Sequence, residues 1–338
     1  YCLDLVPQRI IDGTDFLSDI ALAFIAFSTG EFFKLDVLKR SGMRVVWITV
    51  FEAVLASVLV FILTYFVLRL DLAFSIVLAA LASATAPAST MMTIRQTGAK
   101  GEFVDTLLQV VALDDVVGLV LYSVAISVAL SSLNGAGGFS FETLGKPILI
   151  NLAVLLLGGA FGFAMKLLMP KKRSTDNKLI ISVALLFAFC GVCAALDVSP
   201  LLGCMSMGTV YTNIAEDDKL FKQLAYFSPP ILLLFFVRSG MSFRLDALFS
   251  AAGALDGVPL IAIGVSYFLV RILGKYAGAW LGCLLTKRPK ALRRYLGLAL
   301  IPQAGVAIGL AALGARTLGG AMGSDLQTII LASSVLYE

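Results

Sequence analysis

The chain has 338 residues, of which 59% are hydrophobic and only 14% charged, and its mean hydropathy is +0.95. Soluble proteins carry roughly 45–50% apolar and about 25% charged residues, so the composition excludes a soluble domain. The net charge of +4 is too small to suggest nucleic acid as a partner, which needs a clustered basic face. The lack of histidine removes histidine-based catalysis and most zinc or iron sites. No loop is long enough for an enzyme domain, so we expect neither enzymatic activity nor an organic cofactor.

The apolar residues fall into segments suited to crossing a lipid bilayer, which takes about 20 residues as a helix. The sequence therefore predicts an all-α, multi-pass integral membrane protein. Eleven candidate segments follow in chain order: 15–33, 45–68, 73–94, 102–131, 147–168, 178–196, 199–213, 219–238, 257–285, 291–314 and 324–338.

The loops between these segments predict the orientation of the chain. Most of the 26 Lys and Arg residues lie in one set of alternate loops. Because loops rich in Lys and Arg stay in the cytoplasm, this set is expected to be cytoplasmic. Segment 15–33 then enters from outside, and Glu338 points inward.

Ionisable residues inside these segments are the candidates for function, because charges within a membrane are costly. Asp114 and Asp115 lie within VVALDDVVGLV, and Lys275 lies within YFLVRILGKYAGAW. At about 1.5 Å of rise per residue, Asp114 and Lys275 both come near the midplane, where they could meet. Two adjacent carboxylates at this depth cannot both be charged unless a cation, a proton or an ammonium group neutralises them. The alternative is a buried structural ion-pair cluster.

Glu52 and Arg271 are also expected within the membrane, and we interpret them as a supporting ion pair that braces two helices. Arg271 is one helical turn from Lys275, so both basic side chains share a face. On the same helix, Gly274, Gly278 and Gly282 form a stripe of small residues that permits close approach of another helix.

Two segments carry helix breakers. Pro87 lies among Ser and Thr residues in ALASATAPASTMM, and Pro302 and Gln303 lie in ALIPQAGVAIG. Paired broken helices in corresponding positions indicate the binding site of a transporter. The two segments run in opposite directions, which fits an inverted repeat relating 45–131 to 257–338.

These motifs together resemble the cation/proton antiporter superfamily. TAPAST, LDD in a long helix, RILGK and IPQAGVAIG are similar to the NapA-type sodium/proton antiporter branch. The resemblance implies an inverted-repeat fold with two crossed discontinuous helices, further helices before Tyr1, and a homodimer in the lipid bilayer. It implies a core transport domain formed by 45–131 and 257–338. It also implies a dimerisation domain formed by 1–33 and 178–238, with 147–168 as a linking helix.

The resemblance also implies roles for individual residues. Asp115 would carry the cation or proton, and Asp114 would pair with Lys275, which releases its proton when sodium arrives. Asp114 and Asp115 would thus hold the transported sodium or lithium ion, with Thr85 beside them, while Glu52 and Arg271 match a supporting ion pair. The implied activity is exchange of sodium for protons by an elevator movement. It would serve pH homeostasis in a bacterial inner membrane.

The chain departs from the family pattern at two positions. Electroneutral relatives carry Asn-Asp where this chain has Asp114-Asp115, which points to electrogenic exchange of two protons per sodium ion. Many relatives have an acid after the threonine of the first break, where this chain has Ala86, so the choice among sodium, lithium and potassium stays open.

Three other kinds of protein fit these residues less well. A sodium-coupled solute symporter of related architecture would bind sodium in unwound backbone and would not need a mid-helix lysine beside paired aspartates. An intramembrane aspartyl protease needs two aspartates on different helices. A membrane scaffold would not need the buried charges.

Overall fold

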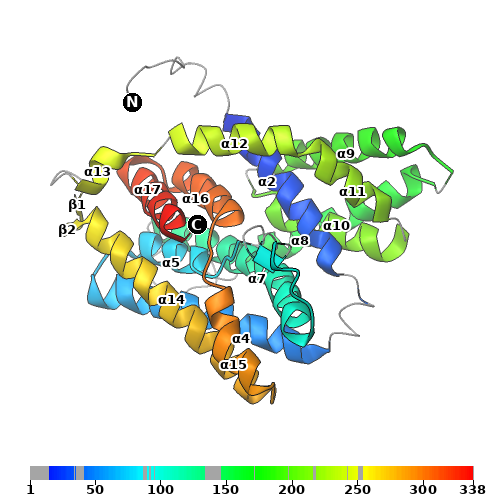
Figure 1. Cartoon of the computed structure of the whole chain (residues 1–338). Helices are drawn as coiled ribbons and strands as arrows, with labels where there is room; N and C mark the ends of the chain where they lie inside the picture. The colour runs from blue at the N-terminus through cyan, green and yellow to red at the C-terminus, as the bar shows by residue number, and fades with distance from the viewer. Residues whose placement is uncertain are drawn as a thin grey trace. The chain divides into compact units, whose positions relative to one another are not determined.

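The computed structural model describes residues 15–33, 35, 42–86, 90, 93–94, 96–133, 146–170, 172–196, 198–215, 218–241, 243–249 and 254–337. These residues are almost entirely helical (Figure 1). The exception is one antiparallel hairpin of β1 (Ala254–Leu255) and β2 (Val258–Pro259). The expectation of an all-α membrane protein is therefore confirmed at the level of the fold class.

Within the described residues, five helices are long and apolar enough to cross a membrane: Met43–Val67, Glu102–Leu133, Leu149–Leu168, Thr175–Ala195 and Leu260–Leu285. Lys219–Phe227 and Pro229–Phe249 qualify as one further span only when taken together, with a bend of 45° between them. Shorter apolar helices cover Asp19–Thr29, Leu72–Leu81 and Gly305–Leu318. The chain is a multi-pass membrane protein, several of whose apolar segments are shortened by breaks.

The chain divides into two compact units, which we describe separately. One comprises Tyr1–Glu31 and Leu152–Ser242, and the other comprises Phe32–Asn151 and Phe243–Glu338. One division falls inside α8, the helix interpreted from the sequence as a linker.

The first unit contains α2 (Asp15–Thr29), the first half of η1 (Gly30–Phe33), most of α8 (Lys146–Leu168), α9 (Thr175–Ala195), α10 (Leu201–Ala215), α11 (Asp218–Phe227) and α12 (Pro229–Met241). Its helices approach closely at glycines. A Cβ on Gly158 would lie 2.1 Å from the backbone oxygen of Gly203, and one on Gly208 would lie 2.1 Å from that of Phe27. The segment expected over 219–238 is divided into two helices, because Pro229 has no N–H and begins the second one.

The second unit holds all of the predicted ion-site residues that the structure describes. Its elements are α4 (Met43–Phe61), the π-helical η2 (Ile62–Val67), α5 (Leu72–Leu81), α7 (Glu102–Leu133), α13 (Leu245–Phe249), the hairpin, α14 (Leu260–Leu285), α15 (Lys290–Ala299), α16 (Gly305–Leu318) and α17 (Gly320–Tyr337). Local signals set several boundaries. The Asp71 side chain caps α5 by accepting hydrogen bonds from the N–H groups of Ala73 and Phe74. Gly319, with φ 67°, ends α16 in a conformation that favours glycine.

Both segments with predicted breaks are interrupted. Helix α5 ends at Leu81, and 84–86 continue without helical structure. Helix α15 ends at Ala299, and α16 does not begin until Gly305. The N–H of Ala86 donates to the carbonyl of Pro302 at 2.9 Å, so the two interruptions meet. Pro87, the breaker expected in the first segment, lies outside the described residues.

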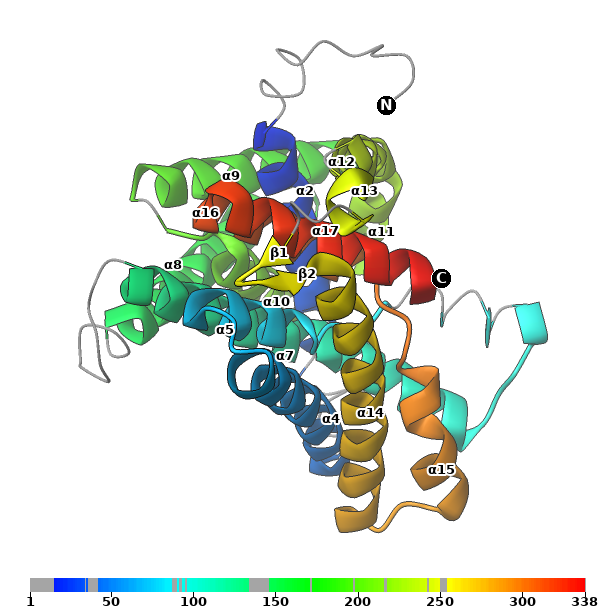
Figure 2. The same ribbon diagram turned by 90° about the vertical axis from the view of Figure 1, so that its left-hand side faces the viewer.

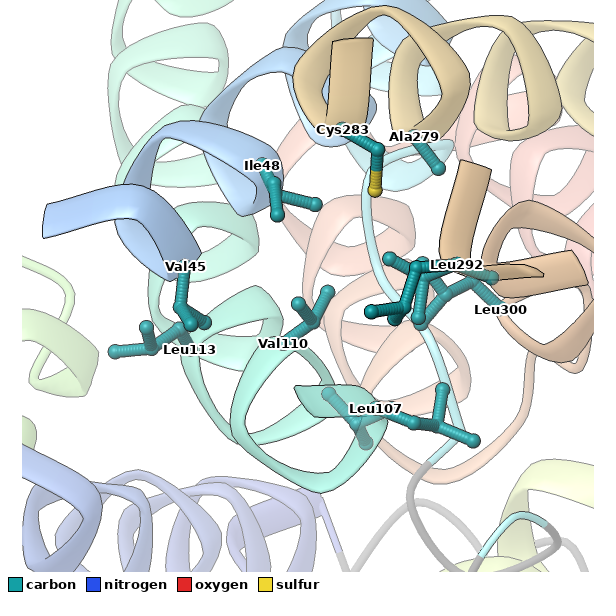
Figure 3. Packing of buried hydrophobic residues seen from close by; sticks show 11 residues of the cluster. Val45, Ile48, Leu107, Val110, Leu113, Ala279, Cys283, Leu292 and Leu300 are labelled. Carbon is teal, nitrogen blue, oxygen red and sulfur yellow. The ribbon is translucent and has the colours of Figure 1, made fainter. Parts of the chain in front are cut away.

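An apolar cluster fills the space between α4, α7, α14 and α15 (Figure 3). Ile48 of α4, Val110 of α7 and Leu296 of α15 are fully buried in it, and Cys283 of α14 points into it as a small apolar residue. Inside a membrane, such side chains stabilise helix packing through close van der Waals contact. This core holds the helices that carry the buried charges.

The glycine stripe on α14 packs directly against α4. A Cβ on Gly274 would come 2.6 Å from Cα of Ala56, one on Gly278 would come 2.5 Å from Cα of Glu52, and one on Gly282 would come 2.8 Å from Cα of Ile48. Real side chains do not approach so closely, so only glycine fits at these positions. The close approach predicted from the sequence is present, and it places Glu52 beside the helix that carries Lys275 (Figure 2).

Candidate ion-binding site

Lys275 is the centre of a buried cluster of charged groups in the second unit. Its ammonium group donates hydrogen bonds to Asp114 Oδ2 at 2.8 Å, to Thr85 Oγ1 at 2.9 Å and to the backbone oxygen of Ser83. The Lys275 and Asp114 side chains are both 0% exposed. Asp114 and Lys275 are therefore in contact, as their similar depth along the two helices predicts. Thr85 lies beside them.

Glu52 also contacts Lys275, with Oε2 2.7 Å from Nζ, and is fully buried. An ammonium group has three N–H bonds, and Ser83, Thr85 and Asp114 already accept all three. Glu52 is thus a fourth oxygen contact of the ammonium and forms a buried ion pair with it.

The expected ion pair between Glu52 and Arg271 is not the pairing that the structure contains. The close packing of Gly278 on the backbone of Glu52 directs this carboxylate to Lys275. Arg271 lies one turn away on α14 and bonds to backbone carbonyls instead. The depth of Glu52 along its helix could not predict which basic residue it would pair with, because Arg271 and Lys275 share a face of α14 and both come within reach of α4.

Arg271 links the two helix interruptions. Its Nε donates to the carbonyl of Ala82 at 3.0 Å, Nη2 to Ala84 at 2.6 Å, and Nη1 to Ile301 at 2.6 Å. Its guanidinium carbon also lies 4.7 Å from the centre of the Tyr337 ring. The planar fork of donors in arginine suits this set of carbonyls, which would otherwise be buried without partners.

Gln303, from the second interruption, binds the end of the first broken helix. Its Nε2 donates to the carbonyl of Leu81, the last residue of α5, at 2.7 Å. Its amide oxygen accepts a hydrogen bond from the Tyr267 hydroxyl at 3.1 Å. Thr85 in turn donates to the carbonyl of Leu300 at 3.5 Å. The sequence indicated the breakers but did not predict Tyr267 as a partner, because nothing local marks a contact between residues so far apart in the chain.

Asp114 and Asp115 adjoin each other on α7, and both are buried. Among the described residues, no hydrogen bond reaches Asp114 Oδ1, Asp115 Oδ1 or Glu52 Oε1. Buried polar atoms normally have partners, so three carboxylate oxygens without one are available to a proton or a cation. The described residues contain no group of three or more Asp, Glu or Cys side chains arranged to hold a metal ion. Backbone oxygens or water would therefore complete the coordination of a small cation.

The charges of the cluster do not balance. Glu52, Asp114 and Asp115 could contribute three negative charges, and Lys275 is the cation in direct contact with two of them. Burying an unneutralised carboxylate costs several kcal/mol in a medium of low polarity. The arrangement therefore favours binding of additional positive charge, either as protons or as a metal cation.

Paired helix interruptions with buried charges are typical of secondary transporters, which bind ions where broken helices meet. Comparison with known proteins supports this class. The chain matches the family described as "Sodium/hydrogen exchanger, transmembrane" over residues 4–337. It belongs to the sodium/hydrogen exchanger family.

A solved structure has the same fold. The sodium proton antiporter MjNhaP1 from Methanocaldococcus jannaschii, determined at pH 8, is similar to this chain with a TM-score of 0.71 and 18% sequence identity. The similarity covers 99% of this chain and 86% of that one. No curated protein sequence matches the chain.

Proposed function

We propose that this protein exchanges sodium ions for protons across a membrane. The observation that carries the proposal is the excess of buried carboxylates around Lys275, with free oxygens on Asp114 and Asp115. Sodium and protons can each neutralise this excess, so they compete for the same groups. Such competition makes the binding of one ion depend on release of the other, which is the requirement for antiport.

Asp115 is the proposed carrier of the transported ion. Its carboxylate is buried and, within the described part of the chain, Oδ1 accepts no hydrogen bond, whereas Asp114 shares the ammonium of Lys275. A sodium or lithium ion would be held by the free oxygens of Asp114 and Asp115, with Thr85 nearby. Sodium and protons are the transported substrates in this scheme.

Lys275 is the proposed source of a second proton. When sodium occupies Asp114, the ammonium loses its hydrogen-bonded carboxylate and can release a proton, which would make exchange electrogenic. Glu52 opposes this step, because it holds a second carboxylate 2.7 Å from the same nitrogen. The number of protons exchanged per sodium therefore depends on Glu52 as well as on the Asp114-Asp115 pair.

The movement we propose is of the elevator type. The unit that carries the ion site would move across the membrane while the other unit, as a dimerisation domain, stays fixed in a homodimer. In this scheme α5 and the α15–α16 pair are the crossed discontinuous helices. The site would cross only when its carboxylates are neutralised, because bare charges are costly inside a membrane. A bacterial inner membrane and a role in pH homeostasis complete the proposal.

The proposal is tested with purified protein in liposomes under an imposed pH gradient, followed with a pH-sensitive dye. Addition of sodium or lithium, but not choline, should collapse the gradient. The Asp115→Asn variant should give no response while remaining folded. Asp105→Asn, an exposed acid on the same helix, is the matched control and should respond like the wild type. If no cation collapses the gradient in folded protein, the sodium-coupled symporter becomes the better proposal, and uptake of labelled solutes would be measured next.

A further inference from the structure

A cationic turn joins α14 to α15, at one end of the second unit (Figure 2). Five basic residues occur within 287–294: Lys287, Arg288, Lys290, Arg293 and Arg294. No acidic residue occurs anywhere between Asp256 and Asp325. The charge of the turn is therefore not balanced by its own segment of the chain.

Three of these basic side chains, Lys287, Lys290 and Arg294, are exposed. The other two have partners within the protein. Arg288 contacts Glu102 at 3.3 Å, and Arg293 Nε donates to the carbonyl of Arg288 at 2.8 Å. These contacts fix the turn, and they leave the three exposed side chains free to bind an external group.

The exposed faces of the two helices change from cationic to apolar with distance from the turn. On α15, Lys290 and Arg294 are followed on the same face by the exposed Leu298, because the three residues are spaced by one helical turn. The Arg294 guanidinium lies 5.4 Å from the centre of the exposed Tyr295 ring.

Helix α14 repeats this order. Moving away from Lys287, its exposed large apolar side chains include Leu284, Trp280 and Leu273. The two helices pack tightly, since a Cβ on Gly297 would lie 2.6 Å from Cα of Tyr276. The hairpin thus presents cations at its turn and exposed apolar side chains, aliphatic and aromatic, beyond them.

This change from cationic to apolar matches a phospholipid, which has an anionic headgroup and apolar acyl chains. We infer that the α14–α15 hairpin is a binding site for an anionic phospholipid, whose phosphate is held by Lys287, Lys290 and Arg294. Exposed basic residues next to a membrane helix attract anionic headgroups. The occupant belongs to the bilayer itself, and the inference does not depend on which ions the protein transports.

Bound lipid would also affect the ion site through α15. The helix begins at the cationic turn and ends at Ala299, directly before the interruption whose Leu300 and Ile301 carbonyls bind Thr85 and Arg271. A lipid that holds the first turn of α15 restrains the other end of the same short helix.

The test measures thermal stability of the full chain in detergent, with phosphatidylglycerol or with phosphatidylcholine of the same acyl chains. Choline replaces sodium in the buffer, so that ion binding does not contribute. The wild type should gain several degrees from phosphatidylglycerol and much less from phosphatidylcholine. The triple variant Lys287→Gln, Lys290→Gln, Arg294→Gln should lose at least half of this gain. Its affinity for the anionic lipid should be roughly 100-fold weaker, about fivefold for each charge.

Two further variants and one soluble probe separate a lipid site from other causes. The variant Lys166→Gln, Lys172→Gln, Lys222→Gln removes three exposed positive charges of the first unit and should keep the gain. A triple variant that preserves the charge of the turn should also keep the gain in thermal stability. It carries Lys287→Arg, Lys290→Arg and Arg294→Lys. Soluble glycerol phosphate should give no gain. The inference is overturned if the first triple variant gains as much as the wild type, or if the scattered variant loses as much. It is also overturned if both lipids stabilise the wild type equally, or if glycerol phosphate stabilises it as much as phosphatidylglycerol does.

Discussion

Lys275 on α14 and Glu52 on α4 form a fully buried ion pair, with Nζ and Oε2 2.7 Å apart. The contact depends on Gly278, whose missing side chain lets the two helix backbones meet beside Glu52. Lys275 thereby has two carboxylate partners, Glu52 and Asp114, on two different helices. The ammonium can lose one of them to an incoming cation and remain paired with the other.

Replacement of Lys275 by Gln should strongly destabilise the protein, because it leaves an excess of buried carboxylates without their cation. Removing one partner from a buried ion pair costs about 3–5 kcal/mol. Thermal unfolding in detergent measures this loss. Adding Glu52→Gln to the Lys275→Gln variant should recover part of the stability. Purely additive losses in the double variant would show that the two side chains are not coupled.

Glu52→Gln alone should change the charge moved per sodium ion. Without the second carboxylate, Lys275 depends on Asp114 alone, and sodium binding at Asp114 should release the lysine proton more readily. We expect a larger current per sodium transported, measured on a solid-supported membrane alongside sodium flux. An unchanged ratio of charge to sodium would mean that Glu52 has only a structural role.

Gly278→Ala should disrupt the packing of α14 on α4. The added Cβ would lie 2.5 Å from Cα of Glu52, so the helices must separate, at a cost of about 1–3 kcal/mol. Thermal stability and exchange should both fall. Gly264→Ala on the same helix is the matched control, because no atom lies within 4 Å of the place that its added Cβ would take. It should be neutral or slightly stabilising, since alanine favours helix by about 1 kcal/mol.

Arg271→Lys should weaken the link between the two helix interruptions. Lysine cannot reach the Ala82, Ala84 and Ile301 carbonyls at once, and each buried carbonyl without a partner costs about 1–3 kcal/mol. Arg288→Lys, which alters a partly exposed pair with Glu102, should have little effect on unfolding temperature. Equal shifts for both variants would contradict the role of Arg271 in bridging the breaks.

The sequence was sufficient to predict the helical class, the two interruptions and the meeting of Asp114 with Lys275, because each depends on local composition or on depth along a helix. It did not predict that Glu52 faces Lys275 instead of Arg271. That choice depends on how α4 and α14 pack, which is set by the contact of Gly278 with Glu52. Nor did it predict the break before Pro229, although the proline itself marks a helix start.

If sodium and protons compete for the same buried carboxylates, the apparent affinity for sodium must depend on pH. Initial rates would be measured in liposomes over a range of sodium concentrations and at several pH values, kept equal on both sides. We expect the apparent KM for sodium to rise as pH falls, by up to about tenfold per pH unit for each proton displaced, while the maximal rate stays nearly constant. A KM that does not change with pH, with only the maximal rate falling in acid, would contradict a shared site.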